Sequence, residues 1–138
     1  MKANIKFVTE KFNVFNRQIF ANELPMLPIR IGHARTSLGG LACNKKTNLF
    51  GKTQYYNFRM IISDSIDLPQ EELEDIIIHE MIHYFIAHKQ IQDTSAHGKL
   101  FMKMMNDINK RFGRHICVSR RQTASELDTI YTLPPKPR

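Results

Sequence analysis

His79, Glu80 and His83 stand together in the pentapeptide HEMIH, and their spacing could build a metal site. On a helix, residues four positions apart share a face, so both imidazoles could bind one metal ion with Glu80 beside them. A structural zinc ion has four protein ligands, whereas two histidines and one further ligand leave a position for water. The metal lowers the pKa of this water toward neutrality, and Glu80 would accept its proton. The motif therefore predicts the site of a zinc hydrolase.

The third ligand must come from outside this pentapeptide, and the chain offers five candidates: His88, Asp93, His97, Asp107 and His115. His88 follows His83 by five residues, which turns it well away from the metal face of the helix. Ile86 and Lys89 stand where a metzincin-type motif has glycine and histidine. No glutamate lies between Glu80 and Glu126 that could be the third metal ligand, as it is in another class of zinc peptidase. We therefore prefer His97, with Asp107 as the second choice.

A second helix is predicted to open at His97. Apolar residues follow this histidine at spacings of four, three, four and four, so they would share one face of the helix with it, and this face would point toward the core. These residues are Phe101, Met104, Ile108 and Phe112. Ser95 could cap this helix. Gly98 would let its first turn pack closely against the first helix, and Gly113 would end it.

The helix that carries the pentapeptide is predicted to start after residues 67–69. Asp67 could cap it, and the proline and acidic residues that follow suit the first turn and the positive end of the helix dipole. From residue 73 to residue 86 the helix is apolar on nearly every side, which is typical of a buried helix. Burying unpaired ionisable side chains is costly, so a bound metal would account for His79 and His83.

The remaining patterns predict an N-terminal helix and a small sheet. Apolar residues at spacings of three and four indicate a helix over residues 4–21. Strands are predicted at 29–33, 38–44 and 55–63, and a hairpin loop with an exposed basic tip at 45–52. A further short strand is predicted at 115–118 and a flexible tail at 132–138. This order favours an α+β fold, a single compact domain with its core at about 4–121 and a small antiparallel sheet of about three strands.

Length and composition fit one globular domain. The chain has 138 residues, of which 42% are hydrophobic and 24% charged, as in ordinary globular proteins. No segment has the length of a membrane span and the N-terminus lacks the apolar run of a signal peptide, so we expect a cytoplasmic location without membrane contact. Cys43 and Cys117 are too few for a disulfide framework, and we assign them no function. The sequence makes no prediction of oligomeric state.

Charge is distributed unevenly along the chain, whose formal net charge is +7. Six acidic residues fall within 64–75, whereas residues 99–121 hold seven basic residues and one acidic residue, Asp107. This basic zone could neutralise phosphates and bind DNA or RNA without regard to base sequence. It could equally be a solvated face that keeps the protein soluble.

The motifs together resemble the SprT-like family of zinc metallopeptidases, which includes the eukaryotic DNA-dependent protease Spartan. HEMIHYFI is followed by AHGKLFMKMMNDINKRFG, which joins HExxH to a later HGxxF and an IN pair. Upstream, FNRQIFANELP resembles the family's early helix and Leu-Pro turn, and GGLACN and RMIISDSIDLP resemble the strands before its active-site helix. The resemblance spans about Phe12 to Gly113.

The resemblance implies a compact zincin fold, peptide-bond hydrolysis and one zinc ion. It implies that His79, His83 and His97 are the zinc ligands and that Glu80 is the catalytic base. In such peptidases an edge strand lines the cleft and pairs with an extended protein substrate, and by analogy this strand is 35–44. In eukaryotic relatives, DNA binding activates proteolysis of proteins crosslinked to DNA, partly through a further zinc-binding element. No matching cysteine set follows Gly113.

The expected mechanism has Glu80 take the proton of the attacking water and later pass it to the leaving amine, and it needs one more group, a donor that stabilises the charge on the tetrahedral intermediate between these two transfers. Arg35, Tyr84 and Tyr131 are candidates. Two alternative functions stay open: a zinc-dependent nucleic-acid hydrolase, and a non-catalytic or weakly catalytic nucleic-acid-binding protein that contains zinc. The hydrolase is disfavoured because no carboxylate cluster for a second metal is evident.

Overall fold

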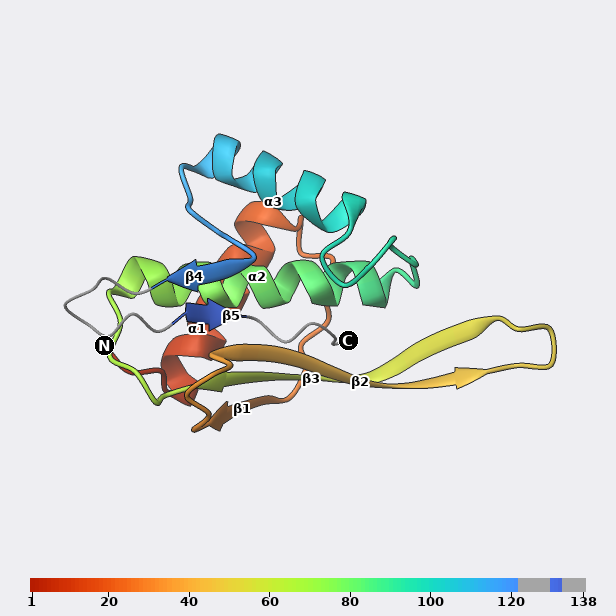
Figure 1. Ribbon diagram of the computed structural model, residues 1–138, viewed down its shortest axis with the longest axis horizontal. Coiled ribbons are helices and arrows are strands. Elements are labelled where there is room, and N and C mark those ends of the chain that lie inside the picture. The colour runs from red at the N-terminus through yellow and green to blue at the C-terminus, as the bar shows by residue number, and fades with distance from the viewer. Residues whose placement is uncertain (122–129, 133–138) are drawn as a thin grey trace.

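The computed structural model describes residues 1–121 and 130–132. Its elements are, in order, α1 (Ile5–Ile19), β1 (Ile29–Gly32), β2 (Gly39–Thr47), β3 (Thr53–Ser63), α2 (Gln70–His88), α3 (Lys99–Phe112), β4 (Ser119–Arg121) and β5 (Ile130–Thr132). Figure 1 shows α2 running above the three-stranded sheet of β1, β2 and β3, with α3 on the opposite side of α2. The predicted α+β class is confirmed.

The sheet is mixed, whereas the sequence predicted an antiparallel one. Its strand order is β1-β3-β2, with β2 antiparallel to β3 and β1 parallel to β3. The chain reverses once between β1 and β2 and again in the β2–β3 hairpin, so β3 returns in the direction of β1 and lies between the two. Among the described residues, β2 is therefore an edge strand on the side away from β1.

The β2–β3 hairpin is longer than predicted, because its strands continue to Thr47 and resume at Thr53. Its tip is not simply basic. Leu49 and Phe50 occupy the turn and are almost fully exposed, with lysines on either side of them.

α2 is the central element of the core. Its buried face meets α1, α3 and the sheet, and the most deeply buried apolar residues come from all of these elements; they include Val8, Phe12, Met60, Ile62, Ile77, Ile78, Met81, Ile82 and Phe101. Asp67 does not cap α2, contrary to the prediction. Pro69 is the N-cap residue, and Asp67 instead pairs with the amino group of Met1.

Two predictions near the C-terminus are also wrong. α3 begins at Lys99, two residues later than expected, and Ser95 is not its cap. Residues 115–118 form an irregular segment, and the strand β4 follows them at Ser119–Arg121, paired with β5. Gly113 ends α3 in the left-handed conformation, as predicted. The expected tail falls on residues 133–138, outside the described residues, apart from Thr132 in β5.

Within the described residues, no helix combines the length and apolar character needed to cross a bilayer.

Candidate metal centre

Three imidazoles converge at one point between α2 and α3. α2 supplies His79 and His83, and the loop before α3 supplies His97. The Nε2 atom of His97 lies 3.2 Å from Nε2 of His79 and 3.2 Å from Nε2 of His83. A tetrahedral zinc ion with nitrogen bonds of about 2.0–2.1 Å holds its nitrogen ligands about 3.3 Å apart. Two of the three nitrogen–nitrogen distances therefore match those of ligands on one ion, and because the ligand atoms of all three histidines lie within 4.8 Å of one another, the group could hold a metal.

The other candidate ligands have different surroundings. His88 packs against the rings of Phe58 and Tyr84. Asp107 is exposed and pairs with Arg111 on the same helix. Asp93 is bound to backbone N–H groups, as described below, and neither it nor His115 belongs to the group of potential metal ligands among the described residues.

The buried ring of His79 is oriented by a backbone carbonyl. Its Nδ1 atom lies 3.1 Å from the oxygen of Cys117. A carbonyl oxygen only accepts hydrogen bonds, so Nδ1 carries the proton and Nε2 presents its lone pair toward the other two histidines. Burial lowers the pKa of His79 to about 3, and the nearby His97 contributes to the same shift. His79 is thus held neutral, the form that binds metals.

The segment that carries this carbonyl, residues 114–118, is fixed by Asn109 of α3. The Asn109 side chain donates to the oxygen of Ile116 at 2.9 Å and accepts from the N–H of Ile116 at 2.8 Å. The Ile116 side chain is itself buried. Asn109 therefore positions the residue next to Cys117, and through it the hydrogen bond to His79.

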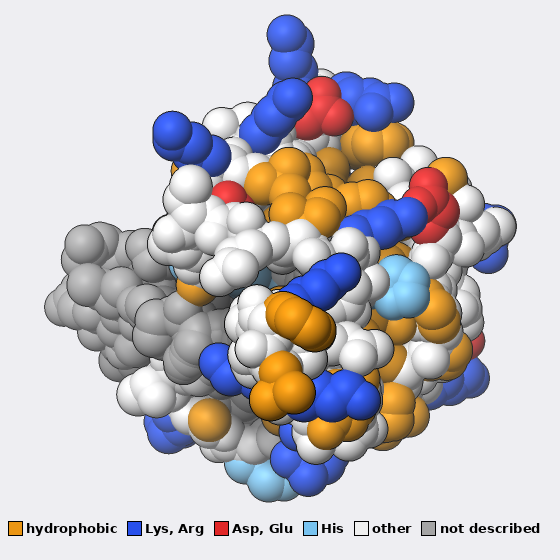
Figure 2. Space-filling view, turned by 90° about the vertical axis from the view of Figure 1, so that its right-hand side faces the viewer, with side chains coloured by type: hydrophobic (Ala, Val, Ile, Leu, Met, Phe, Trp, Pro, Cys, Tyr) orange, Lys and Arg blue, Asp and Glu red, His pale blue; other side chains and the backbone are white. Residues whose placement is uncertain are grey.

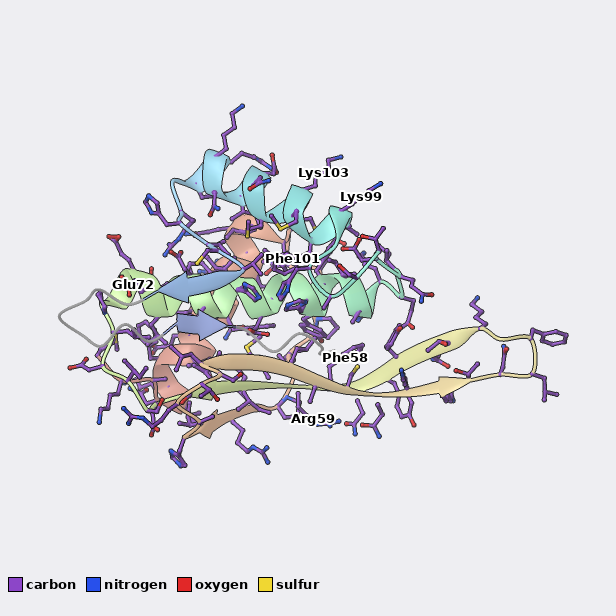
Figure 3. All side chains as sticks on the ribbon, viewed as in Figure 1. Phe58, Arg59, Glu72, Lys99, Phe101 and Lys103 are labelled. Atoms are coloured by element: carbon purple, nitrogen blue, oxygen red, sulfur yellow. The ribbon has the colours of Figure 1, made fainter. Side chains whose placement is uncertain are left out.

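The aromatic ring of Phe101 packs against all three imidazoles. Its fully buried ring lies 4.8 Å from the ring of His79, 4.6 Å from His83 and 4.9 Å from His97, measured between centroids. In Figure 3, Phe101 points from α3 toward α2. Packing on one rigid ring restricts the orientations that the three ligands can adopt.

The loop that delivers His97 is tied to the start of α3 by Asp93. The carboxylate of Asp93 accepts hydrogen bonds from the N–H groups of Leu100 and Phe101, and the hydroxyl of Thr94 accepts from Lys99. Gly98 allows this arrangement, because a Cβ there would lie 2.6 Å from Asp93 Oδ1 and 2.4 Å from Thr94 Oγ1. The glycine therefore serves the loop, and not the packing against α2 that the sequence suggested.

Glu80 is buried on α2, and β2 begins directly against it. A Cβ at Gly39 would lie 2.9 Å from Oε2 of Glu80 and 3.0 Å from Ile76. Gly39 therefore leaves room for the carboxylate of Glu80.

A cleft of about 750 Å³ opens beside His83. Residues 40–43 of β2 line one side, and residues 91–93 with Ser95 and Ala96 line the other. These β2 residues lie within the predicted cleft-lining segment 35–44.

Two of the three candidate donors for an oxyanion can be described. The hydroxyl of Tyr84 donates to the carbonyl of Pro25 at 2.8 Å, so it is already engaged away from the histidines. Arg35 is exposed in the loop between β1 and β2. The side chain of Tyr131 lies outside the described part of the chain.

The basic zone of residues 99–121 has fewer basic side chains available to an acidic partner than its sequence suggests. Arg114 is half-buried, donates to Asp75 at 2.7 Å and pairs with Glu74 at 3.1 Å. Its pKa is raised because these two carboxylates outweigh the effect of burial. Lys99 and Lys103 instead project from the outer face of α3, as Figure 3 shows.

Comparison with known proteins gives two findings. The profile of the SprT-like family matches residues 8–122. A stretch of 52 residues, 36% of the chain, is 42% identical to the DNA-dependent metalloprotease SPRTN of Xenopus tropicalis. The matched stretch makes up 12% of that relative, so the chain corresponds to a small part of its length.

Proposed function

The chain belongs to the SprT-like family, and from this premise we propose that it is a zinc-dependent metallopeptidase. The observation that carries the proposal is the convergence of three imidazole Nε2 atoms, from two helix positions and one loop, beside a buried glutamate and an open cleft.

His79, His83 and His97 are the proposed ligands of one zinc ion. Three neutral nitrogen donors suit zinc, and the carbonyl that orients His79 is the kind of outer partner that zinc-binding histidines have. When bound, zinc would supply Lewis acidity, which makes water a nucleophile near neutral pH and polarises a carbonyl.

Glu80 is the proposed general base. Its carboxylate would accept a proton from the attacking water and deliver it to the leaving amine, so that one residue serves both proton transfers. Glu80 follows the proposed ligand His79 in the sequence and is buried, and Gly39 leaves the space that its carboxylate needs.

β2 is the proposed docking strand for the substrate. It is an edge strand among the described residues, and its residues 40–43 line the cleft beside His83. An extended polypeptide could add to this edge through main-chain hydrogen bonds, which would place a peptide bond near the histidines.

We further propose that the substrates include DNA-associated or DNA-crosslinked proteins. The support is the printed name of the relative SPRTN, a DNA-dependent metalloprotease, together with the exposed lysines of α3. Lys99, Lys103 and Lys110 could contact phosphates without regard to base sequence.

Zinc-loaded protein should be incubated separately with labelled casein, a DNA-crosslinked protein, and bare DNA or RNA. Cleavage of the proteins, abolished in Glu80→Gln while zinc content stays the same, is the expected result. A Glu80→Gln variant as active as the parent protein would refute the base assignment. Cleavage of bare nucleic acid alone would favour the hydrolase alternative, and binding without any cleavage would favour a nucleic-acid-binding protein with zinc.

A further inference from the structure

Beyond the cleft, β2 and β3 continue as a two-stranded arm that projects away from the helices (Figure 1). We call residues 44–57 of this arm the distal hairpin. Its turn is closed by hydrogen bonds, because the Asn48 side chain accepts from the N–H groups of Phe50 and Lys52. Backbone hydrogen bonds also join Asn48 to Gly51 and Lys52. These hydrogen bonds therefore fix the backbone conformation from which the side chains of the turn project.

The side chains at the tip are apolar. Leu49 is 99% exposed and Phe50 is 92% exposed, the highest values among the exposed large hydrophobic residues described. The core gains nothing from either side chain. Adjacent exposed hydrophobic residues on an ordered turn are typical of a contact surface for another molecule.

The charge around this tip has one sign. No aspartate or glutamate occurs from residue 24 to residue 63, a stretch that includes the whole hairpin. Lys45, Lys46 and Lys52 lie in the distal hairpin. Figure 2, which views the end of the molecule toward which the hairpin projects, shows several basic side chains around a group of hydrophobic ones. The surface therefore suits a partner that is both acidic and apolar.

We infer that the distal hairpin is a substrate-binding exosite for acidic, apolar segments of extended polypeptides. The inference rests on the proposed function and specifies its substrate class. The same strand lines the cleft at residues 40–43 and leads outward to Leu49 and Phe50. Because Leu49 and Phe50 follow residues 40–43 by six to ten positions, a polypeptide that pairs with the edge of β2 at the cleft would reach the tip after about that many of its own residues, at about 3.3 Å per residue.

An extended polypeptide fits this arm better than a nucleic acid does. The edge of β2 offers backbone N–H and C=O groups at the spacing of another strand, which a nucleic-acid backbone does not match. Lys45 and Lys46 lie on β2 itself, and Leu49 and Phe50 lie in the turn that follows it, so a polypeptide paired with that edge would bring its own side chains toward them.

The experiment uses the zinc-loaded full chain and one cleavable core peptide with a fluorophore and a quencher. Separate versions of this core peptide carry, on one end or the other, a six-residue tail made of glutamate and leucine, of lysine and leucine, or of glycine and serine. The parent protein should show a KM roughly fivefold lower for the acidic tail than for the glycine-serine tail, at equal kcat. The double variant Lys46→Glu with Lys52→Glu should reverse this preference and favour the basic tail, with the tail-free core cleaved as before.

Two further variants test the location. Leu49→Ser with Phe50→Ser should lose the benefit of the leucines in the tail. Lys103→Glu with Lys110→Glu, the same charge change on exposed positions of α3, should keep the acidic preference. Equal KM values for all tails, or a preference abolished only by the α3 variant, would overturn the exosite.

Binding of a labelled single-stranded oligonucleotide tests the alternative that the distal hairpin binds nucleic acid. Oligonucleotide binding that is lost in the hairpin variant, without any discrimination among peptide tails, would identify a nucleic-acid site and overturn the inference. Failure to cleave the tail-free core would contradict the proposed function instead. Fluorescence anisotropy of the labelled tailed peptides with the Glu80→Gln protein then decides the exosite by binding alone.

Discussion

The Nδ1 atom of His79 lies 3.1 Å from the carbonyl oxygen of Cys117, a residue that comes after α3 in the chain. This contact joins the first imidazole of the candidate site to the segment after the last helix of the core. The segment is held by Asn109, whose amide forms two hydrogen bonds with the backbone of Ile116. The orientation of a proposed zinc ligand therefore depends on a side chain that does not approach the metal position itself.

Replacing Asn109 should weaken metal binding more than it weakens the fold. In Asn109→Ala the segment that presents the Cys117 carbonyl loses both hydrogen bonds, so His79 loses its orienting partner. We expect zinc affinity, measured by chelator competition, to fall roughly 10- to 100-fold. Asn106→Ala, at an exposed position of the same helix, should leave the affinity unchanged. Equal zinc affinity in both variants would show that the Cys117 contact has no part in metal binding.

Phe101→Ala should damage both stability and the site. Removing a fully buried ring leaves a cavity that costs about 3–5 kcal/mol, and all three imidazoles lose their common packing surface. Phe101→Leu keeps most of the volume and should fold with a smaller loss. Urea unfolding and zinc titration of both variants check this. If the leucine variant binds zinc as tightly as the parent protein, the ring fills space but does not orient the histidines.

Asp93→Asn should reduce the pH dependence of stability in acid. Burial alone would raise the pKa of Asp93, but hydrogen bonds from the N–H groups of Leu100, Phe101 and Thr94 lower it below its ordinary value. A lowered folded-state pKa contributes stability that is complete above the unfolded pKa of about 3.9 and is lost as the pH falls through the folded value.

The measurement for Asp93 is urea unfolding of the metal-free protein between pH 3 and pH 7. The asparagine variant should be destabilised by about 1 kcal/mol at pH 7, and its difference from the parent protein should shrink toward pH 3. A difference that stays constant with pH would mean that the charge of Asp93 does not stabilise the start of α3.

Gly39→Ala should lower turnover without removing metal. The added methyl group would lie 2.9 Å from Oε2 of Glu80, and the end of that flexible side chain is the group most able to move. We expect a kcat about tenfold lower, because small displacements of a catalytic base are costly, with zinc content unchanged. Gly32→Ala in β1, where the added methyl group would lie 3.1 Å from the side chain of Ile61, is a control away from Glu80. Full activity of Gly39→Ala would mean that Glu80 tolerates displacement.

Local spacing predicted the parts of the site that lie on one helix. His79 and His83 share a face because they are four residues apart, whatever the rest of the fold does. The positions of Asn109 and the Cys117 carbonyl could not be predicted in this way. A backbone carbonyl has no distinctive side chain, and its contact with His79 depends on how α3 packs on α2. The IN pair of the family resemblance, which includes Asn109, was the available signal.

The errors in the fold prediction have similar causes. Asp93 bonds to the first turn of α3 from six positions before the helix starts at Lys99, whereas cap prediction considers the residue next to the helix. The parallel pairing of β1 with β3 depends on the path of the connections, which alternation of side chains does not reveal. The hairpin tip was predicted to be basic from its composition, but only the turn geometry decides that Leu49 and Phe50 are almost fully exposed there.

The central claim is that His79, His83 and His97 bind one zinc ion together. Zinc content per chain should be measured for the parent protein and for His79→Ala, His83→Ala, His97→Ala and His88→Ala after purification in chelator-treated buffer. We predict one zinc ion per chain in the parent protein and in His88→Ala, and little or none in the other three. Full zinc content in any of those three variants, or no zinc in the parent protein, would contradict the claim.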